Sequence, residues 1–271
     1  MTQHWFMTQT TTQSPHSVVE ALRGERTQRP HVDATSAAGL RGELEDGIYQ
    51  VFGSTTPRHP VIVRASSLRQ PHPATDLALS RTGLLRGVLV SQLLRLMSVG
   101  VVVEHAFDDA IDTLRGEGRA VDLLGHLDQL DNEERARLAT DVTAHAVTLS
   151  RSMGEVASHW TPRTAVAGNQ RLGGGRVVLR DVVDLVIGSS EGDVASIVLF
   201  DLTTSPLGEG AERVLRYHAL VHTLKTSIVP WRSAMFSSAT GELWTRNVDF
   251  EMLARSVHEV LAVVEELGSI S

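Results

Sequence analysis

Two apolar runs separated by a short polar segment dominate the second half of the chain. The first run, residues 176–187, is dense in Val, Leu and Ile, and so is the second run, residues 194–204. Between them, residues 189–193 (SSEGD) are of the types that form tight turns. The pattern predicts a β-hairpin of two long strands, which we expect to lie at the centre of a sheet.

Apolar residues recur at helical spacing through most of the first half of the chain. The spacing predicts helices over residues 35–52, 74–99, 106–115, 120–129 and 133–153, with one short strand at 61–63. Asp131, with Glu134 three residues later, has the spacing of a capping box at the start of the last helix. Residues 66–75 are expected to be a connector, and residues 163–175 a loop that leads into the hairpin. Residues 35–160 are therefore expected to be a mainly helical region.

After the hairpin the pattern returns to mixed elements. It predicts a helix at 212–226, strands at 228–237 and 241–248 joined by a turn at 239–241, and a closing helix at 250–267. We expect Val214, Tyr217, Val221 and Leu224 to be the buried positions of the first helix. The order of elements predicts an α+β (mixed α/β) fold, with a central sheet flanked by helices and preceded by a helical region.

The first 34 residues have a different composition, rich in Thr, Gln, Ser, His and Pro. We expect a mobile N-terminal arm with one short helical segment at residues 17–26. Trp5 and Phe6 either anchor this arm or are a chance exposed aromatic pair.

Composition narrows the class of protein. Hydrophobic content is 42% and mean hydropathy is −0.03, and no apolar run approaches the roughly 18–20 residues of a membrane helix. We expect no membrane partner, and the absence of a signal-like start favours a cytoplasmic location. The chain has no cysteine, which excludes disulfides, thiolate zinc sites and an iron–sulfur cluster.

The formal net charge of −7 argues against a protein that coats DNA. Residues 161–246 are nevertheless the least acidic stretch, with 9 basic and 8 acidic residues. The arginines of this stretch form either a phosphate-facing patch or a solvated surface; they are Arg163, Arg171, Arg176, Arg180, Arg213, Arg216, Arg232 and Arg246.

Each strand of the predicted hairpin carries an acid inside its apolar run, Asp184 in the first and Asp201 in the second. A buried carboxylate is costly unless it is paired, hydrogen-bonded or bound to a metal. Two acids on neighbouring strands can share a hard divalent cation such as Mg²⁺ or Mn²⁺. Alternatively, both acids cap strand ends or pair with Arg180 and Arg213.

The hairpin and the helix after it resemble the RecB-type branch of the PD-(D/E)XK nuclease family. In that family the first acid ends a G-x-x-D strand, the second begins D/E-x-K on the next strand, and a helix follows with a Gln-x-x-x-Tyr pattern. Asp184 falls at the first acid, Asp201 at the second, and Arg213 with Tyr217 at the helix pair. Thr203 stands where the family has lysine.

The family usually also has a metal-binding His in an early helix, within G-x-x-x-H. In this chain Ser91 stands at that place after Gly87. The resemblance covers about a third of the chain well, and residues 161–271 would be the nuclease-like core.

The resemblance implies a restriction-endonuclease-like sheet and hydrolysis of phosphodiester bonds. Mg²⁺ or Mn²⁺ would be held by Asp184, Asp201 and the carbonyl of Leu202, and Thr203, Arg213 and Tyr217 would complete the site. Nucleic acid, and DNA in particular, is the implied substrate, with a helicase or another protein as a further partner.

Two classes of function remain open. The first is a metal-dependent DNA nuclease that uses the two acids and a substituted third group. The second is a catalytically silent relative that binds nucleic acid or acts as a scaffold in a DNA-processing or defence complex. Thr203 and Ser91 favour the silent class, whereas the two acids in matching strands favour the nuclease.

Three further patterns involve residues that could bind a metal or a phosphate. His218 and His222, four residues apart on one helix, are either a zinc-binding pair or a partly exposed pair. Residues 173–175, Gly-Gly-Gly, are a phosphate cradle or, because a strand follows them, a hinge. Lys225, the only lysine, lies too far around the helix from Tyr217 to replace the missing family lysine easily.

Overall fold

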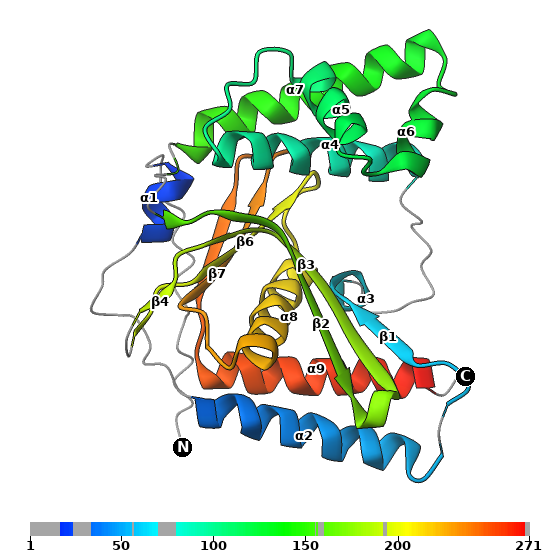
Figure 1. Cartoon of the computed structure of the whole chain (residues 1–271), viewed down its shortest axis with the longest axis vertical. Helices are drawn as coiled ribbons and strands as arrows, with labels where there is room; N and C mark the ends of the chain where they lie inside the picture. The colour runs from blue at the N-terminus through cyan, green and yellow to red at the C-terminus, as the bar shows by residue number, and fades with distance from the viewer. Residues whose placement is uncertain are drawn as a thin grey trace, which may run out of the picture.

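The computed structural model describes residues 17–23, 34–55, 57–69, 80–154, 156, 160–191 and 194–268. They form an α+β fold in which a mixed sheet lies between two groups of helices (Figure 1). This confirms the predicted fold class and the helical region in the first half of the chain. None of the helices in these ranges is long and apolar enough to cross a membrane.

Strands β3 (Val177–Ile187) and β6 (Val198–Thr203) are antiparallel neighbours in the middle of the sheet, as the apolar runs predicted. The strand order is β1-β3-β6-β7-β8. β1 (Val61–Arg64) runs parallel to β3, and β7 (Arg232–Ser237) runs parallel to β6. β8 (Leu243–Asn247) is antiparallel to β7.

The predicted turn of the hairpin carries a small extension of its own. β4 (Ser190–Glu191) and β5 (Val194–Ala195) pair as a separate two-stranded sheet between β3 and β6. The second apolar run is thus divided between β5 and β6.

The prediction of a loop before the hairpin is wrong, because Arg163–Leu172 forms a long strand, β2, antiparallel to β3. Its exposed positions carry Arg, Ala and Asn, and its inward positions include Thr164, Gly168 and Gln170, so the sequence lacks the apolar run typical of a central strand. Gly173–Gly175 makes the tight turn between β2 and β3, with φ of 59°, 63° and 94°. The Gly173 N–H donates to the Glu45 carboxyl group. The segment is therefore a connection between strands, and its first N–H is not available to a phosphate.

One group of helices packs on the sheet and shares one apolar core with it. It contains α4 (Arg81–Ser98), α5 (Ala106–Gly116), α6 (Val121–Leu127) and α7 (Asn132–Met153). The predicted capping box at the start of α7 is present, with the Asp131 side chain accepting from the Glu134 N–H. Buried residues of these helices, among them Leu89, Leu93, Leu138 and Leu149, share one core with Leu185 of β3, Phe200 of β6 and Phe236 of β7.

The second group of helices surrounds α8 (Glu209–Thr226), which lies near the centre of the molecule in Figure 1. α2 (Ala34–Phe52) and α9 (Phe250–Gly268) lie side by side and pack on α8. The positions predicted to be buried in α8 are all 5% exposed or less; they are Val214, Tyr217, Val221 and Leu224. A short helix, α3 (Ala65–Arg69), occupies part of the expected connector and packs on α8.

The short helical segment expected at residues 17–26 is present as helix α1 (Val18–Arg23). Its apolar residues Val18, Val19 and Leu22 are buried with the core around α7, so this segment contributes enough apolar burial to be ordered. The Arg232 guanidinium also donates to the Ala21 carbonyl. The rest of the expected arm, including Trp5 and Phe6, lies outside the described residues.

Residues from both sides of position 160 build one core. Leu40, Leu44 and Ile48 of α2 and Val61 and Val63 of β1 pack with residues of β3, α8 and α9. The expected helical region 35–160 is therefore divided in space, with α2, β1 and α3 on the α8 side and α4–α7 forming the other group.

Candidate active site

The site begins where β6 separates from β3. Backbone pairing between the two strands runs from Ile187 opposite Val198 to Leu185 opposite Phe200. Two residues further along β6, the Leu202 N–H donates to the Asp184 carboxyl group at 2.9 Å. A buried backbone N–H needs an acceptor, and here a side chain of β3 replaces its backbone. The separation of the strands therefore fixes the position of Asp184.

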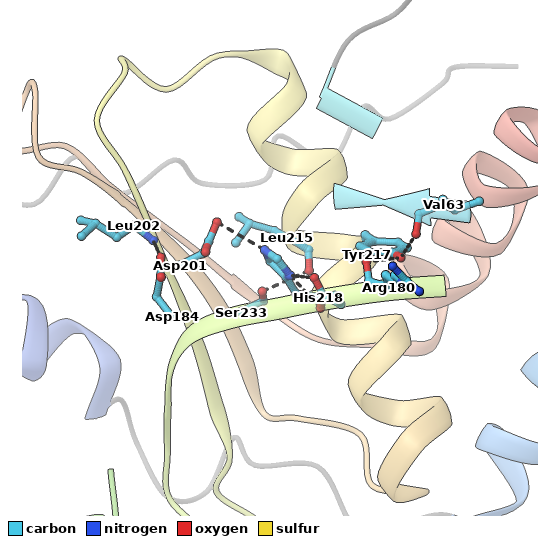
Figure 2. A network of polar contacts seen from close by, with 10 residues as sticks. Val63, Arg180, Asp184, Asp201, Leu202, Leu215, Tyr217, His218 and Ser233 are labelled. Carbon is cyan, nitrogen blue, oxygen red and sulfur yellow. Dashed lines mark hydrogen bonds and ion pairs between the residues drawn. The ribbon is translucent and has the colours of Figure 1, made fainter. Parts of the chain in front are cut away.

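Asp184 and Asp201 lie close together at this separation, as predicted (Figure 2). Their carboxyl groups also share a hydrogen bond. Burial and the neighbouring Asp201 charge raise the pKa of Asp184 well above its ordinary value. Asp184 therefore carries the proton of the pair and donates it to Asp201. The partners of the two acids are each other, Leu202, Ser91 and His218, and the alternative pairing with Arg180 and Arg213 is not seen.

A buried histidine continues the network from Asp201. His218 of α8 points toward Asp201 of β6, with Nε2 3.4 Å from Asp201 Oδ2 (Figure 2). On its other side, Nδ1 lies 2.9 Å from both carboxyl oxygens of Asp181 of β3. Burial alone would lower the pKa of His218, but Asp181 and Asp201 raise it well above its ordinary value. The ring is therefore an imidazolium that donates to Asp181 and forms an ion pair with Asp201.

The ion pair with His218 also explains why Asp201 is ionised. Burial would raise its pKa, but the charge and hydrogen bond of His218, the hydrogen bond with Asp184 and the Arg69 charge together lower the pKa below its ordinary value. Asp201 is thus the ionised member of the acid pair.

Sequence reasoning missed Asp181 and the link through His218. Asp181 lies in the same apolar strand as Asp184 and at an inward position, two residues after Leu179 and two before Val183. The sequence did contain a signal for Asp181, because a second acid within one buried strand also needs a partner.

The zinc hypothesis for His218 and His222 is not supported. Both nitrogens of His218 face carboxyl groups, and the described residues contain no group of three His, Cys, Asp or Glu side chains suited to a metal. Burial, followed by the Arg163 and Lys225 charges, lowers the pKa of His222 to about 4, so this ring is neutral.

A cavity of about 360 Å³ opens beside the acid pair, between α4 and the sheet. Asp184, Leu202 and Thr203 line it from the sheet, and Arg69, Arg95 and Arg119 supply its basic side chains. These arginines come from the first half of the chain, whereas the expected basic patch lay in residues 161–246.

Several members of the expected patch are bound to acids elsewhere. Arg216 donates to Glu259 at 2.7 Å, and Arg246 pairs with Glu212. These two arginines are therefore paired, half-buried groups and do not line the cavity.

Ser91 also lines the cavity, and its side chain hydrogen-bonds to Asp184. It lies on α4 one turn after Gly87, where an added Cβ would find nothing within 4 Å. Ser91, which the resemblance aligns with a histidine, thus lies beside Asp184, and its side chain is too short and too weak a ligand to hold a cation alone.

Arg69 reaches the cavity because α3 packs closely on α8. A Cβ added at Gly210 would lie 2.2 Å from the Arg69 carbonyl oxygen, so only glycine permits this approach. The close contact places the last residue of α3 at the rim of the cavity.

Of the remaining predicted site residues, one lines the cavity and the others do not. Thr203 lines the cavity. Tyr217 does not, because its ring is buried and its hydroxyl donates to the carbonyls of Val63 and Arg180, at 2.9 and 3.0 Å (Figure 2). Tyr217 therefore joins α8 to β1 and β3, and its predicted catalytic role is replaced by a structural one. Arg213 is not among the residues that line the cavity, and Lys225 donates to the Ala167 carbonyl of β2.

Comparison with known proteins adds little to this geometry. No protein-family model matches the chain, and no curated protein matches it. A solved structure described as "Crystal structure of SSO0001" aligns over 85% of each chain, with 8% sequence identity and a TM-score of 0.32.

Proposed function

We propose that the chain is a metal-dependent nuclease of the RecB-like PD-(D/E)XK type, which hydrolyses phosphodiester bonds of DNA at the cavity beside Asp184 and Asp201. The observation that carries the proposal is the meeting of two carboxyl groups from adjacent strands at the edge of a cavity whose other charged side chains are arginines. Acids for a cation and arginines for phosphate are what phosphodiester hydrolysis requires.

The residues present fit a hard divalent cation. Asp184 and Asp201 offer carboxyl oxygens, and Leu202 offers a carbonyl on the same side of β6 as the N–H that binds Asp184, since both groups of a strand residue face one neighbour. With two carboxylates and one carbonyl, a bound Mg²⁺ or Mn²⁺ would keep several waters, as Mg²⁺ usually does. Such a cation lowers the pKa of a bound water and offsets charge on the phosphate.

The chain's own residues would prepare this site. His218 holds Asp201 ionised and fixes its orientation, while Leu202 and Ser91 orient Asp184. Arg69 lies at the rim and can hold a phosphate as a charged fork, although a guanidinium cannot act as a base. Thr203 can donate or accept a hydrogen bond but supplies no charge in place of the family's lysine.

A catalytically silent nucleic-acid-binding or scaffold subunit is the second candidate. It is favoured by the way in which Asp184 is satisfied without a cation, through the Leu202 N–H, Ser91 and the proton shared with Asp201. The uncharged Thr203 points in the same direction. A helicase or other component of a DNA-processing or defence complex would then be the partner.

Thermal unfolding with Mn²⁺ separates these candidates. If the acids bind the cation, a hundredfold excess over Kd should raise the Tm of the wild type by roughly 5 °C. Asp184→Asn and Asp201→Asn should each abolish that rise, whereas Asp112→Asn, on the exposed face of α5, should retain it. Cleavage of linear and single-stranded DNA with Mn²⁺ is measured on the same four proteins. A wild type with neither a Tm rise nor cleavage would leave only the silent candidate.

A further inference from the structure

We propose that Gln92, Arg95 and Arg119 form a phosphate-binding subsite on the helical wall of the cavity, which holds a nucleic-acid strand next to the acid pair. The inference rests on the proposed function and deepens it, because it names the group of the substrate that this wall would bind.

Gln92 is the unusual residue of this wall. It lies on α4, is 2% exposed and lines the cavity. Its Oε1 accepts from Arg119 Nη1 at 3.1 Å, but its Nε2 is buried with no hydrogen-bond partner among the described residues. A buried amide that lacks a partner is costly, so an acceptor supplied by a ligand would relieve the cost.

The charges around Gln92 favour an anion. Arg95 and Arg119 both pair with Glu117, which leaves one positive charge in excess in this cluster. Their side chains are 34% and 42% exposed and both line the cavity, so the guanidinium groups can reach a ligand there.

The hydrogen-bonding groups point to phosphate more specifically. The Gln92 oxygen already accepts from Arg119, so the groups that these three side chains still offer a ligand are mainly donors, an amide N–H and guanidinium N–H groups. A group that only accepts, such as a phosphodiester, satisfies them, whereas a sugar or base also brings donors that would need acceptors. Because Gln92 and Asp184 line the same cavity, the bound phosphate belongs to a nucleotide close to the one at the acids.

Binding of a fluorescein-labelled twelve-nucleotide oligo-dT, followed by anisotropy in EDTA, tests the subsite without cleavage. Arg119→Gln and Gln92→Glu should each weaken binding by about tenfold or more, and Gln92→Met by a few-fold, since they remove or repel a phosphate contact. Arg119→Gln should also make the slope of log K against log salt shallower by roughly 0.7, the value for one phosphate on a single strand. Arg115→Gln is the matched control, because Arg115 pairs with Asp128 and does not line the cavity.

Each outcome of this experiment either supports or overturns the subsite. The outcome against the subsite is a wild type that binds the oligonucleotide no better than Arg119→Gln and Gln92→Met do, with equal salt slopes. The Gln92 amide is then satisfied by a water alone, and the subsite is overturned. Retained Tm values show that the variants fold. The Mn²⁺ response of the acids is measured separately, so a failed subsite with an intact Mn²⁺ shift leaves the nuclease proposal standing. An intact subsite without any Mn²⁺ shift supports the silent binder.

Discussion

At the scale of single residues, four ionisable side chains share a small buried space. Asp181, His218, Asp201 and Asp184 form a continuous series in which carboxyl groups alternate with the imidazolium and with a shared proton. Each group is tolerated in a low-dielectric environment because its neighbour offsets its charge. The outer end of the series, Asp184, is the part that lines the cavity.

Replacing Thr203 with lysine tests whether the site is an intact but disarmed nuclease. Thr203 lines the cavity, so a lysine there should place an ammonium group beside the acids. We expect this to raise Mn²⁺-dependent cleavage of DNA by about tenfold or more. Combination with Ser91→His should add a ligand beside Asp184 and strengthen the Mn²⁺-induced rise in Tm. Thr204→Lys, at the next lining position, controls for added charge alone. If none of these variants cleaves DNA, the nuclease proposal is contradicted.

His222 makes stability depend on pH. Its pKa falls from 6.5 to about 4 on folding because of burial, so between these values the unfolded chain binds more protons than the native protein. The free energy of unfolding is then fully retained above pH 6.5 and decreases as the pH falls toward 4, by about 3 kcal/mol for this group. Urea unfolding of the wild type and His222→Gln across this range measures the difference. His59→Gln, an exposed site, should keep the wild-type slope.

At the scale of elements, the position of the site follows from the separation of two strands and the close approach of two helices. The separation of β6 from β3 gives Asp184 a backbone donor to bind, and the approach of α3 to α8 at Gly210 brings Arg69 to the rim. α4 completes the cavity with a face on which Gly87 and Ser91 leave space. None of these arrangements belongs to one element alone.

Helix α1 should contribute measurably to stability although it is short. Leu22 is 1% exposed in the core shared with α7, so Leu22→Ala should reduce the free energy of unfolding by about 2–4 kcal/mol. Val102→Ala, at an exposed position, should change it by less than about 0.5 kcal/mol. Equal stability of the two variants in urea would show that α1 does not remain docked in solution.

At the scale of the whole molecule, the sheet binds both groups of helices into one structure. β1 and α2 precede the helices α4–α7 in sequence but pack with α8 and α9 on the other side. The acids lie on the sheet, and the basic side chains of the cavity come from α3, α4 and the segment after α5. The proposed site therefore exists only when the two halves of the chain are together.

A fragment of residues 161–271 should consequently fail to fold as a unit. It lacks α2 and β1, which bury Leu44, Ile48 and Val63 against β3, α8 and α9, and it exposes the sheet face that α4–α7 cover. We expect a weak, non-cooperative urea transition by circular dichroism, in contrast to a cooperative one for the full chain. A cooperative transition of the fragment would contradict the shared core.

The sequence by itself determined the central hairpin, most of the helices, the buried face of α8 and the two acids at matching strand positions. These features follow from local periodicity and from the cost of burying a carboxylate, both of which are visible in one stretch of chain. The polar strand β2, the docking of α1, the structural role of Tyr217 and the Asp181–His218 link were decided by tertiary structure. So were the arginines of the cavity, because Arg69, Arg95 and Arg119 lie far from the acids in sequence. Contacts between distant segments depend on how strands diverge and helices pack, and no local pattern encodes that geometry.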